Sequence, residues 1–173
     1  GGVYIRRYDE QGNPTSDEFQ INQAWVNDQN DPSVVELENG NLVVTWQCDT
    51  LDGDRGIVST IVNPDNTMVN EFVVNTQTSG KQHIHTTTVL ENGNYVIVWF
   101  DENDTNTKGQ IFNDQGVAVG NELQINTSSP TEGNLDWRDS PGITSLSDGG
   151  FFVTWQSYGD GAFDVYGQFF EEN

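Results

Sequence analysis

The chain has 173 residues, 34% of them apolar and 11% aromatic, and its formal charge at pH 7 is −21. An acidic surface of this kind repels phosphate backbones and anionic membranes, which argues against a nucleic-acid partner. No stretch is apolar and long enough to cross a bilayer, so membrane insertion is not expected, and the single cysteine, Cys48, excludes an intrachain disulfide.

The chain opens on two β-rich runs, residues 3–8 and 18–22, joined by a polar turn. We call them C-type and D-type strands, because similar runs return later. Residues 33–37 and 42–46 follow as A-type and B-type strands joined through Asn39-Gly40, a pair that accepts the positive φ angles of a tight hairpin. The same order then continues with expected strands at 57–62 (C), 71–75 (D), 87–90 (A), 95–99 (B), 109–112 (C), 122–126 (D), 142–146 (A), 151–155 (B) and 165–170 (C).

One phrase recurs three times along this series: ENGNLVVTWQ at 38–47, ENGNYVIVWF at 91–100 and SDGGFFVTWQ at 147–156. The pattern predicts thirteen strands and no helix, because no apolar run sustains a helical period. Antiparallel four-stranded units of about 50 residues are typical of β-propeller blades. We therefore expect an all-β, propeller-like fold of repeated four-stranded antiparallel units, with a β-sandwich pair or an elongated β-solenoid as the alternatives.

We interpret the chain as one β-repeat domain that consists of a half repeat (1–23), two repeats (24–80 and 81–133) and a partial third repeat (134–173). Counted as D–A–B–C, it holds three blades plus one extra N-terminal strand. Three blades do not close an ordinary propeller, which needs at least four. The chain is therefore either a fragment or a protein that assembles with itself, since an open β edge is a template for strand addition.

The tryptophans divide into two groups. Trp46, Trp99 and Trp155 end the three B-type strands, where we expect them in the structural core. Trp25 and Trp137, the latter followed by Arg138, lie in connections between D-type and A-type strands. An exposed Trp next to polar side chains stacks on sugar rings, which makes these three residues candidates for ligand binding, whereas packing of the loops against a neighbouring blade is the alternative that we favour.

An acidic loop follows each B-type strand. Carboxylates spaced by glycine are the ligands that Ca²⁺ prefers, so calcium is the one cofactor that the sequence suggests. Solvated acidic turns, in which Asp and Gly satisfy the turn geometry, are the alternative. The candidate calcium ligands are Asp49, Asp52, Asp54, Asp101, Asp104, Asp160 and Asp164.

Catalytic motifs are missing from the sequence. His83 and His85 would point to one face of a strand and make half of a zinc site, but no further Cys or His completes it, and we favour an accidental surface pair. The chain contains no nucleophile elbow, no HExxH and no phosphate-binding glycine loop. The sequence therefore predicts a protein that is not an enzyme.

The phrases at 2–22, 31–47 and 140–170 resemble the tandem repeats of the DGGFVVVWQS type, which occur in very large secreted or surface RTX-like adhesins of bacteria. The resemblance covers nearly the whole chain. It implies an extracellular, non-enzymatic, propeller-like module that is adhesive and calcium-dependent. The second copy departs most, because Phe100 replaces the usual Gln and its loop lacks the glycine.

Two functional hypotheses follow. The first is an extracellular structural or adhesive β-repeat protein that assembles with itself through its open edges into an oligomer or filament. The second is a calcium-dependent, carbohydrate-binding, lectin-like propeller whose partners are glycans.

Overall fold

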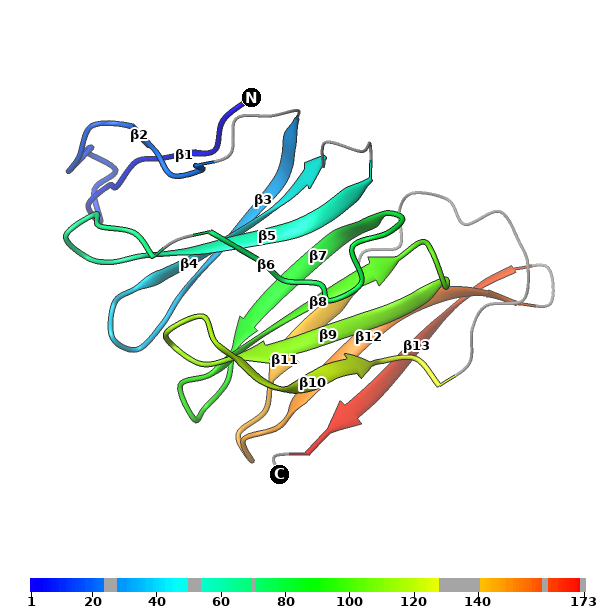
Figure 1. Ribbon diagram of the computed structural model, residues 1–173. Coiled ribbons are helices and arrows are strands. Elements are labelled where there is room, and N and C mark those ends of the chain that lie inside the picture. Colours follow the sequence, from blue (N-terminus) through cyan, green and yellow to red (C-terminus); the bar gives the residue numbers. More distant parts are fainter. Residues whose placement is uncertain (24–27, 50–53, 70, 128–140, 160–161, 172–173) are drawn as a thin grey trace.

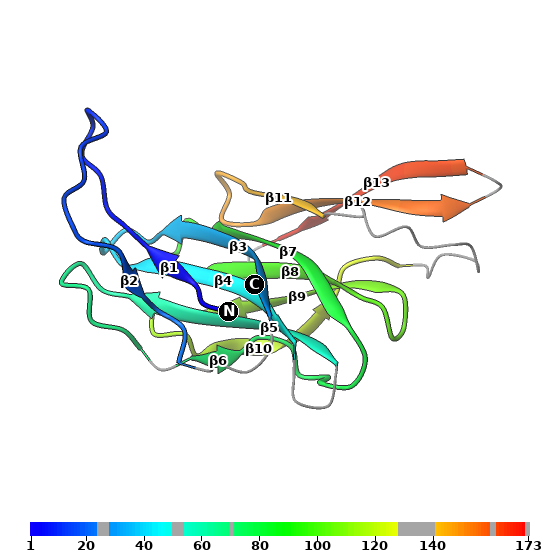
Figure 2. The ribbon, with the colours of Figure 1, turned by 90° about the horizontal axis from the view of Figure 1, so that it is seen from above.

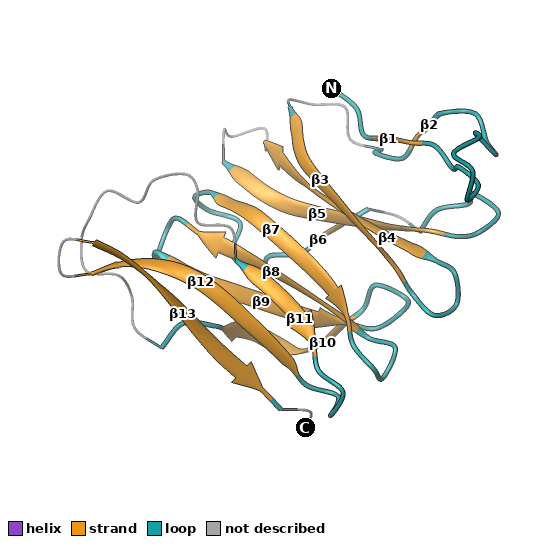
Figure 3. Ribbon diagram, turned by 180° about the vertical axis from the view of Figure 1, so that it is seen from behind, coloured by secondary structure: helices purple, strands orange, loops and turns teal. Residues whose placement is uncertain are grey.

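The computed structural model describes residues 1–23, 28–49, 54–69, 71–127, 141–159 and 162–171, and every regular element among them is a β-strand (Figure 3). Within these residues there is no helix of the length and apolarity that a membrane span needs. The strands are β1 (Tyr4–Ile5), β2 (Phe19–Gln20), β3 (Gln29–Glu36), β4 (Leu42–Asp49), β5 (Arg55–Val62), β6 (Phe72–Val73), β7 (Gln82–Val89), β8 (Tyr95–Asp101), β9 (Asn106–Phe112), β10 (Ala118–Gln124), β11 (Gly142–Ser145), β12 (Phe151–Gly159) and β13 (Ala162–Phe170).

These strands form four antiparallel sheets, β1–β2, β3–β4–β5–β6, β7–β8–β9–β10 and β11–β12–β13, which follow one another from the N-terminus to the C-terminus (Figure 1). The prediction of an all-β chain of repeated antiparallel units is confirmed. Each D-type strand pairs with the C-type strand before it, so the hydrogen-bonded sheets run A–B–C–D, whereas our count grouped each D-type strand with the following A-type strand. The first strands of the three larger sheets are neighbours, with β7 in contact with both β3 and β11.

The A–B hairpins turn where the sequence predicts. Gly40, Gly93 and Gly149 occupy equivalent turn positions with φ angles of 80°, 82° and 90°. Residues with a Cβ rarely adopt this left-handed conformation, so glycine at these positions keeps the hairpin and its register.

Apolar side chains from successive sheets form three hydrophobic clusters, one at each interface between sheets. Trp46 packs between β1–β2 and the first four-stranded sheet, Trp99 between the two four-stranded sheets, and Trp155 between the second of these and the last sheet. They are 1%, 0% and 9% exposed. Because side chains alternate along a strand, the central strands β4 and β8 contribute to the clusters on both of their faces.

A repeated side-chain contact joins each D-type segment to its C-type strand. The side-chain oxygen of an asparagine just beyond the D-type strand accepts a hydrogen bond of 2.8–2.9 Å from a backbone N–H of the C-type strand. The residue before the asparagine donates its own N–H to the carbonyl of the same C-type residue. We call this contact the asparagine clamp; its pairs are Asn22 with Val3, Asn75 with Ile57 and Asn126 with Thr107.

The inner strands β3 and β7 each carry a bulge at the same place in the repeat. The register shifts between Asn30 and Ser33 in β3 and between His83 and Thr86 in β7. Each bulge contains a non-glycine residue in the left-handed region, Asp31 at φ 49° and Ile84 at φ 56°. A β-branched residue in this region is strained by roughly 1–3 kcal/mol and persists only where its surroundings enforce it.

Candidate functional site

The acidic loop between β8 and β9 surrounds a lysine of its own chain. The Nζ atom of Lys108 lies 2.9 Å from the Asp101 carboxylate, 2.8 Å from that of Asp104 and 3.8 Å from that of Glu122. The Asp101 side chain is 1% exposed and that of Lys108 is 14% exposed. Burial alone would lower the pKa of the Lys108 ammonium, but its hydrogen bonds and attraction to Asp104 and Asp101 outweigh burial and raise the pKa.

This lysine belongs to a polar network that joins the two four-stranded sheets. The buried Gln82 side chain donates to Asp101 and accepts from the Asn75 side chain, so the asparagine clamp of the first sheet reaches the acidic loop of the second. On the other side, Glu122 accepts hydrogen bonds of 2.8 and 2.9 Å from the hydroxyl and backbone N–H of Thr76. We call this network the inter-sheet polar junction. Its carboxylates compensate a buried ammonium and fix two sheets relative to each other.

The loop after β4 shows a simpler version of this arrangement. Asp49 forms an ion pair with Arg55, its cross-strand neighbour, at 2.9 Å. Asp54 is half-buried just before β5, and Asp164 is exposed on β13. Asp52 and Asp160 lie outside the described residues.

In the part of the chain that the structure describes, no group of three or more His, Cys, Asp or Glu side chains is arranged to hold a metal ion. Three of the candidate ligands, Asp49, Asp101 and Asp104, are instead engaged with cationic side chains. Calcium binding stays a prediction of the sequence. The candidate ligand-binding residues Trp25, Trp137 and Arg138 also lie outside the described residues.

The two histidines are not the exposed surface pair that the sequence suggested. His83 is 7% exposed and packs edge-to-face on Phe100 with ring centroids 5.6 Å apart. Both ring nitrogens of His85 are buried as well. The bulge at Ile84 interrupts the strand alternation between them, so the expectation that they share one face no longer follows from their spacing.

Around these histidines the bulged inner strands gather polar side chains that the sequence did not single out. Gln47 of β4 donates a hydrogen bond to the carboxylate of Asp31 in the β3 bulge. Burial lowers the pKa of both histidines. At His83 the Glu102 carboxylate opposes this most, and at His85 a backbone hydrogen bond with Thr45 does, while Asp31 raises both pKa values only slightly. A pattern of alternating apolar and polar residues does not predict where a strand bulges, so nothing in the sequence indicated this cluster.

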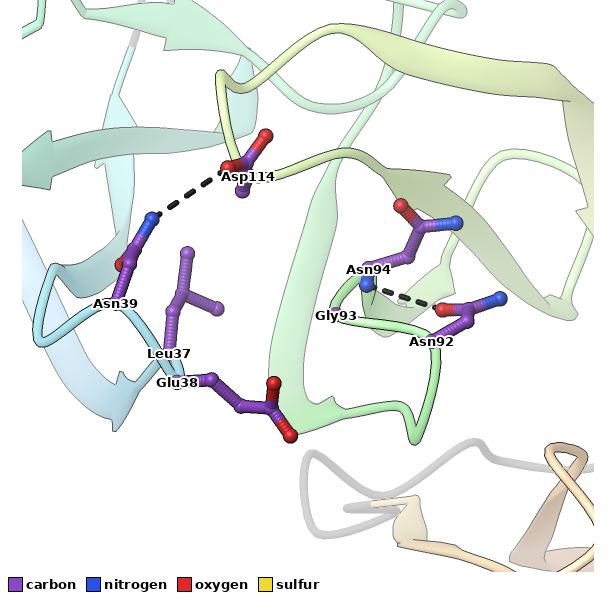
Figure 4. A pocket seen from close by; sticks show the side chains of 7 residues that line it. All are labelled: Leu37, Glu38, Asn39, Asn92, Gly93, Asn94 and Asp114. Atoms are coloured by element: carbon purple, nitrogen blue, oxygen red, sulfur yellow. Dashed lines mark hydrogen bonds between the residues drawn. The ribbon is translucent and has the colours of Figure 1, made fainter.

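An open polar pocket of about 310 Å³ lies between the A–B hairpins of the two four-stranded sheets and the turn that joins β9 to β10 (Figure 4). Asn39 donates to the carboxylate of Asp114 across the pocket at 3.4 Å, and the Asn92 side chain accepts from the backbone N–H of Asn94 at 3.0 Å. Leu37, Glu38 and Gly93 complete the lining. Amide and carboxylate groups on both sides of an open hollow provide donors and acceptors for a polar, uncharged ligand.

The comparisons with known proteins show the fold and leave the family open. Neither a family model nor a curated protein sequence matches the chain. Among solved structures, the endo-arabinase from Bacteroides thetaiotaomicron VPI-5482 superposes with a TM-score of 0.56 and 16% sequence identity over 80% of this chain and 55% of that chain. The chain thus spans about half the length of that structure, and at this identity the likeness shows the fold alone.

This comparison corrects one expectation. We predicted from the absence of catalytic motifs that the chain is not an enzyme, but the fold that it adopts is shared with an endo-arabinase, which is an enzyme. The prediction failed because local sequence motifs detect only sites built from residues that are close in sequence. A propeller-like array brings together side chains from separate repeats, and no motif search sees such a site.

The inter-sheet polar junction yields a first prediction. Replacing Lys108 by Met leaves the buried Asp101 carboxylate without its cation, which should lower the free energy of unfolding by about 3 kcal/mol. The exposed pair of Lys81 and Glu102, 3.4 Å apart, is the matched control, and Lys81→Met should cost less than about 1 kcal/mol. Urea denaturation at neutral pH measures both. Equal losses in the two variants would contradict a buried, cation-dependent junction.

The histidines yield a second prediction. Their folded pKa values lie below the ordinary value of about 6.5, so the unfolded chain binds protons first as the pH falls. Their contribution to stability is therefore complete above that pH and is lost progressively below it. The free energy of unfolding should fall between about pH 7.5 and pH 5.5, and it should fall less in His85→Asn and least in the His83→Asn/His85→Asn double variant. An unchanged pH dependence in the double variant would refute buried neutral imidazoles.

Proposed function

We propose that this chain is an extracellular structural or adhesive β-repeat protein whose copies associate head to tail through the two end faces of the stack of sheets. The extracellular setting rests on the resemblance to secreted and surface repeats. The association rests on one observation. Apolar side chains on the outer face of the last sheet are exposed, whereas the equivalent side chains of the first four-stranded sheet are buried by the sheet that follows it.

The outer face of the last sheet is formed by alternate residues of β13. Val165 is 76% exposed, Phe169 is 66% exposed and Phe163 is 44% exposed. The pairing of Val165 with Gln156 repeats that of Ile57 with Gln47, so Val165 and Phe169 correspond to Ile57 and Ile61 of β5. Both of these isoleucines are 0% exposed, because the next sheet covers them. The face of β13 therefore has the chemistry of an interface between sheets. Figure 2 shows β13 at the outer side of the last sheet.

The opposite end of the stack exposes the complementary kind of face. Tyr4 and Tyr8 are 53% and 58% exposed, and the guanidinium of Arg6 lies over the Tyr8 ring at 5.8 Å from its centroid. The counterparts of Tyr8 in the next two sheets, Val62 and Phe112, are 0% and 3% exposed because a preceding sheet packs on them. The two exposed faces lie at opposite ends of the molecule (Figure 1).

Contact between two different faces is heterologous, so repeated association produces rings or open arrays rather than only dimers. The charge of −21 opposes such contacts at long range. Salt screens this repulsion, with a Debye length of about 10 Å at 0.1 M, and leaves the apolar contact intact. Association should therefore strengthen with ionic strength, the opposite of what a contact between opposite charges would do.

The proposal is tested by Phe169→Lys, which removes apolar surface from the outer face while making the chain less acidic. Sedimentation velocity of the unmodified chain should show assemblies that grow with protein and salt concentration, and Phe169→Lys should abolish them. Val117→Lys is the matched control, because Val117 is 59% exposed on another surface and the charge change is the same. A monomer at all salt concentrations, or equal loss in both variants, would rule the proposal out.

A second candidate, glycan binding, is favoured by the polar pocket between the A–B hairpins. Its lining of Asn39, Asn92, Asn94 and Asp114 offers amide and carboxylate partners for sugar hydroxyls, and the fold is shared with an endo-arabinase. The ligand class suggested by that comparison is an arabino-oligosaccharide.

Titration of the ¹⁵N-labelled chain with a linear arabino-oligosaccharide tests this candidate. Saturable shifts of the Asn92 to Asn94 amides are expected, and they should weaken in Asn94→Ala but not in Asn121→Ala, which changes an exposed residue outside the pocket. The absence of any shift at millimolar sugar would eliminate the candidate.

A further inference from the structure

Among the described strands, β13 pairs only with β12, on one of its two edges. We infer that the other edge of β13 is an acceptor for one particular kind of extended segment, an asparagine-bearing strand with the pattern apolar–x–Ile/Val–Asn, supplied in trans by a chain with the same type of repeat. This inference concerns the edge of the last sheet, whereas the proposed self-association concerns its face, so each can fail without the other.

The edge of β13 presents the backbone groups that the asparagine clamp uses elsewhere. In the first three sheets, the clamped residues Val3, Ile57 and Thr107 direct their N–H and carbonyl groups toward the D-type segment. In the two four-stranded sheets this is the side away from the B-type strand. Ile57 pairs with Gln47 and Thr107 with Phe100, in the same register in which Val165 pairs with Gln156. Val165 therefore directs its N–H and carbonyl groups toward the outer edge.

A second anchor, the Gln168 side chain, lies three residues after Val165 on β13. In the second four-stranded sheet, the Gln110 side chain donates both to the carbonyl of Ile111 and to that of Val119 on the paired D-type strand, at 2.9 and 3.3 Å. Gln168 occupies the same register position on β13 and donates to the carbonyl of Phe169 at 3.3 Å. Its amide is positioned to bridge to an incoming strand in the same way.

The three occupied edges define what the incoming strand must carry. The residue before each asparagine is Ile21, Val74 or Ile125, and these are 1%, 3% and 1% exposed in the clusters between sheets. An aromatic or leucine side chain lies two residues earlier, at Phe19, Phe72 and Leu123. On β13 the same isoleucine or valine would cover Val165, and the asparagine oxygen would accept the Val165 N–H.

Backbone pairing alone would let any extended peptide add to the edge. The asparagine makes the site selective. In the first four-stranded sheet the Asn75 side chain accepts the Ile57 N–H beyond the end of β6, a contact that a peptide without asparagine would not make. Loss of one such hydrogen bond corresponds to roughly tenfold weaker binding.

The test uses the ¹⁵N-labelled chain and a synthetic peptide of residues 117–127, VAVGNELQINT, which contains the longest D-type strand. We expect saturable amide shifts centred on Val165 to Phe169, and about tenfold weaker binding when the peptide carries the Asn126→Ala change. In the protein, Val165→Pro removes the edge N–H and should abolish binding, while an edge strand tolerates proline. Val165→Thr keeps the N–H and should bind normally.

Three results would overturn the inference: equal binding of the two peptides, equal binding to the Val165→Pro and Val165→Thr proteins, or no shift at millimolar peptide. The titration is repeated in Phe169→Lys, where the face is altered and the edge is kept. If Phe169→Lys loses self-association but still binds the peptide, the edge and the face act separately. If the unmodified chain self-associates but does not bind the peptide, the proposed function stands and this inference is wrong.

Discussion

The fold depends on the burial of the B-type strands on both faces. In β8, Tyr95, Ile97 and Trp99 enter the cluster toward the preceding sheet, while Val96 and Val98 enter the cluster toward the following one. All five side chains are 0% exposed. Full burial of an apolar side chain of this size stabilises by roughly 1.5–3 kcal/mol, so a single strand supports two interfaces at once. No sheet of this kind buries both of its faces alone, and each repeat therefore depends on its neighbours.

This dependence explains how a chain with only 34% apolar residues maintains an ordered stack. The interfaces are thin layers, and at two kinds of place along their margins side chains satisfy polar groups of the chain. The asparagine clamp closes the D-type segments, and the inter-sheet polar junction encloses Lys108 among carboxylates. From the sequence, Asp101 and Asp104 were candidate ligands for an external cation. In the structure both carboxylates form ion pairs with Lys108 of the same chain.

The same architecture explains why the absence of local catalytic motifs does not decide whether such a chain is an enzyme. Polar groups that are distant in sequence meet at the bulged inner strands, where Asp31 of β3, Gln47 of β4 and the histidines of β7 lie together. Neither their spacing nor their local sequence resembles a catalytic motif, and a likeness to an endo-arabinase was needed to show that such a fold includes enzymes.

The sequence by itself determined the strands, their order, the hairpin turns and the three buried tryptophans. These features are local, because Asn-Gly or Asp-Gly turns and alternating apolar residues act over a few positions. Only the tertiary structure decided which strand closes each sheet, that Lys108 lies among the loop carboxylates, that the inner strands bulge at Asp31 and Ile84, and that the histidine ring nitrogens are buried. Each of these results depends on contacts between residues of different strands or sheets. The free energy of such a contact depends on both partners, so the sequence of one segment alone does not predict it.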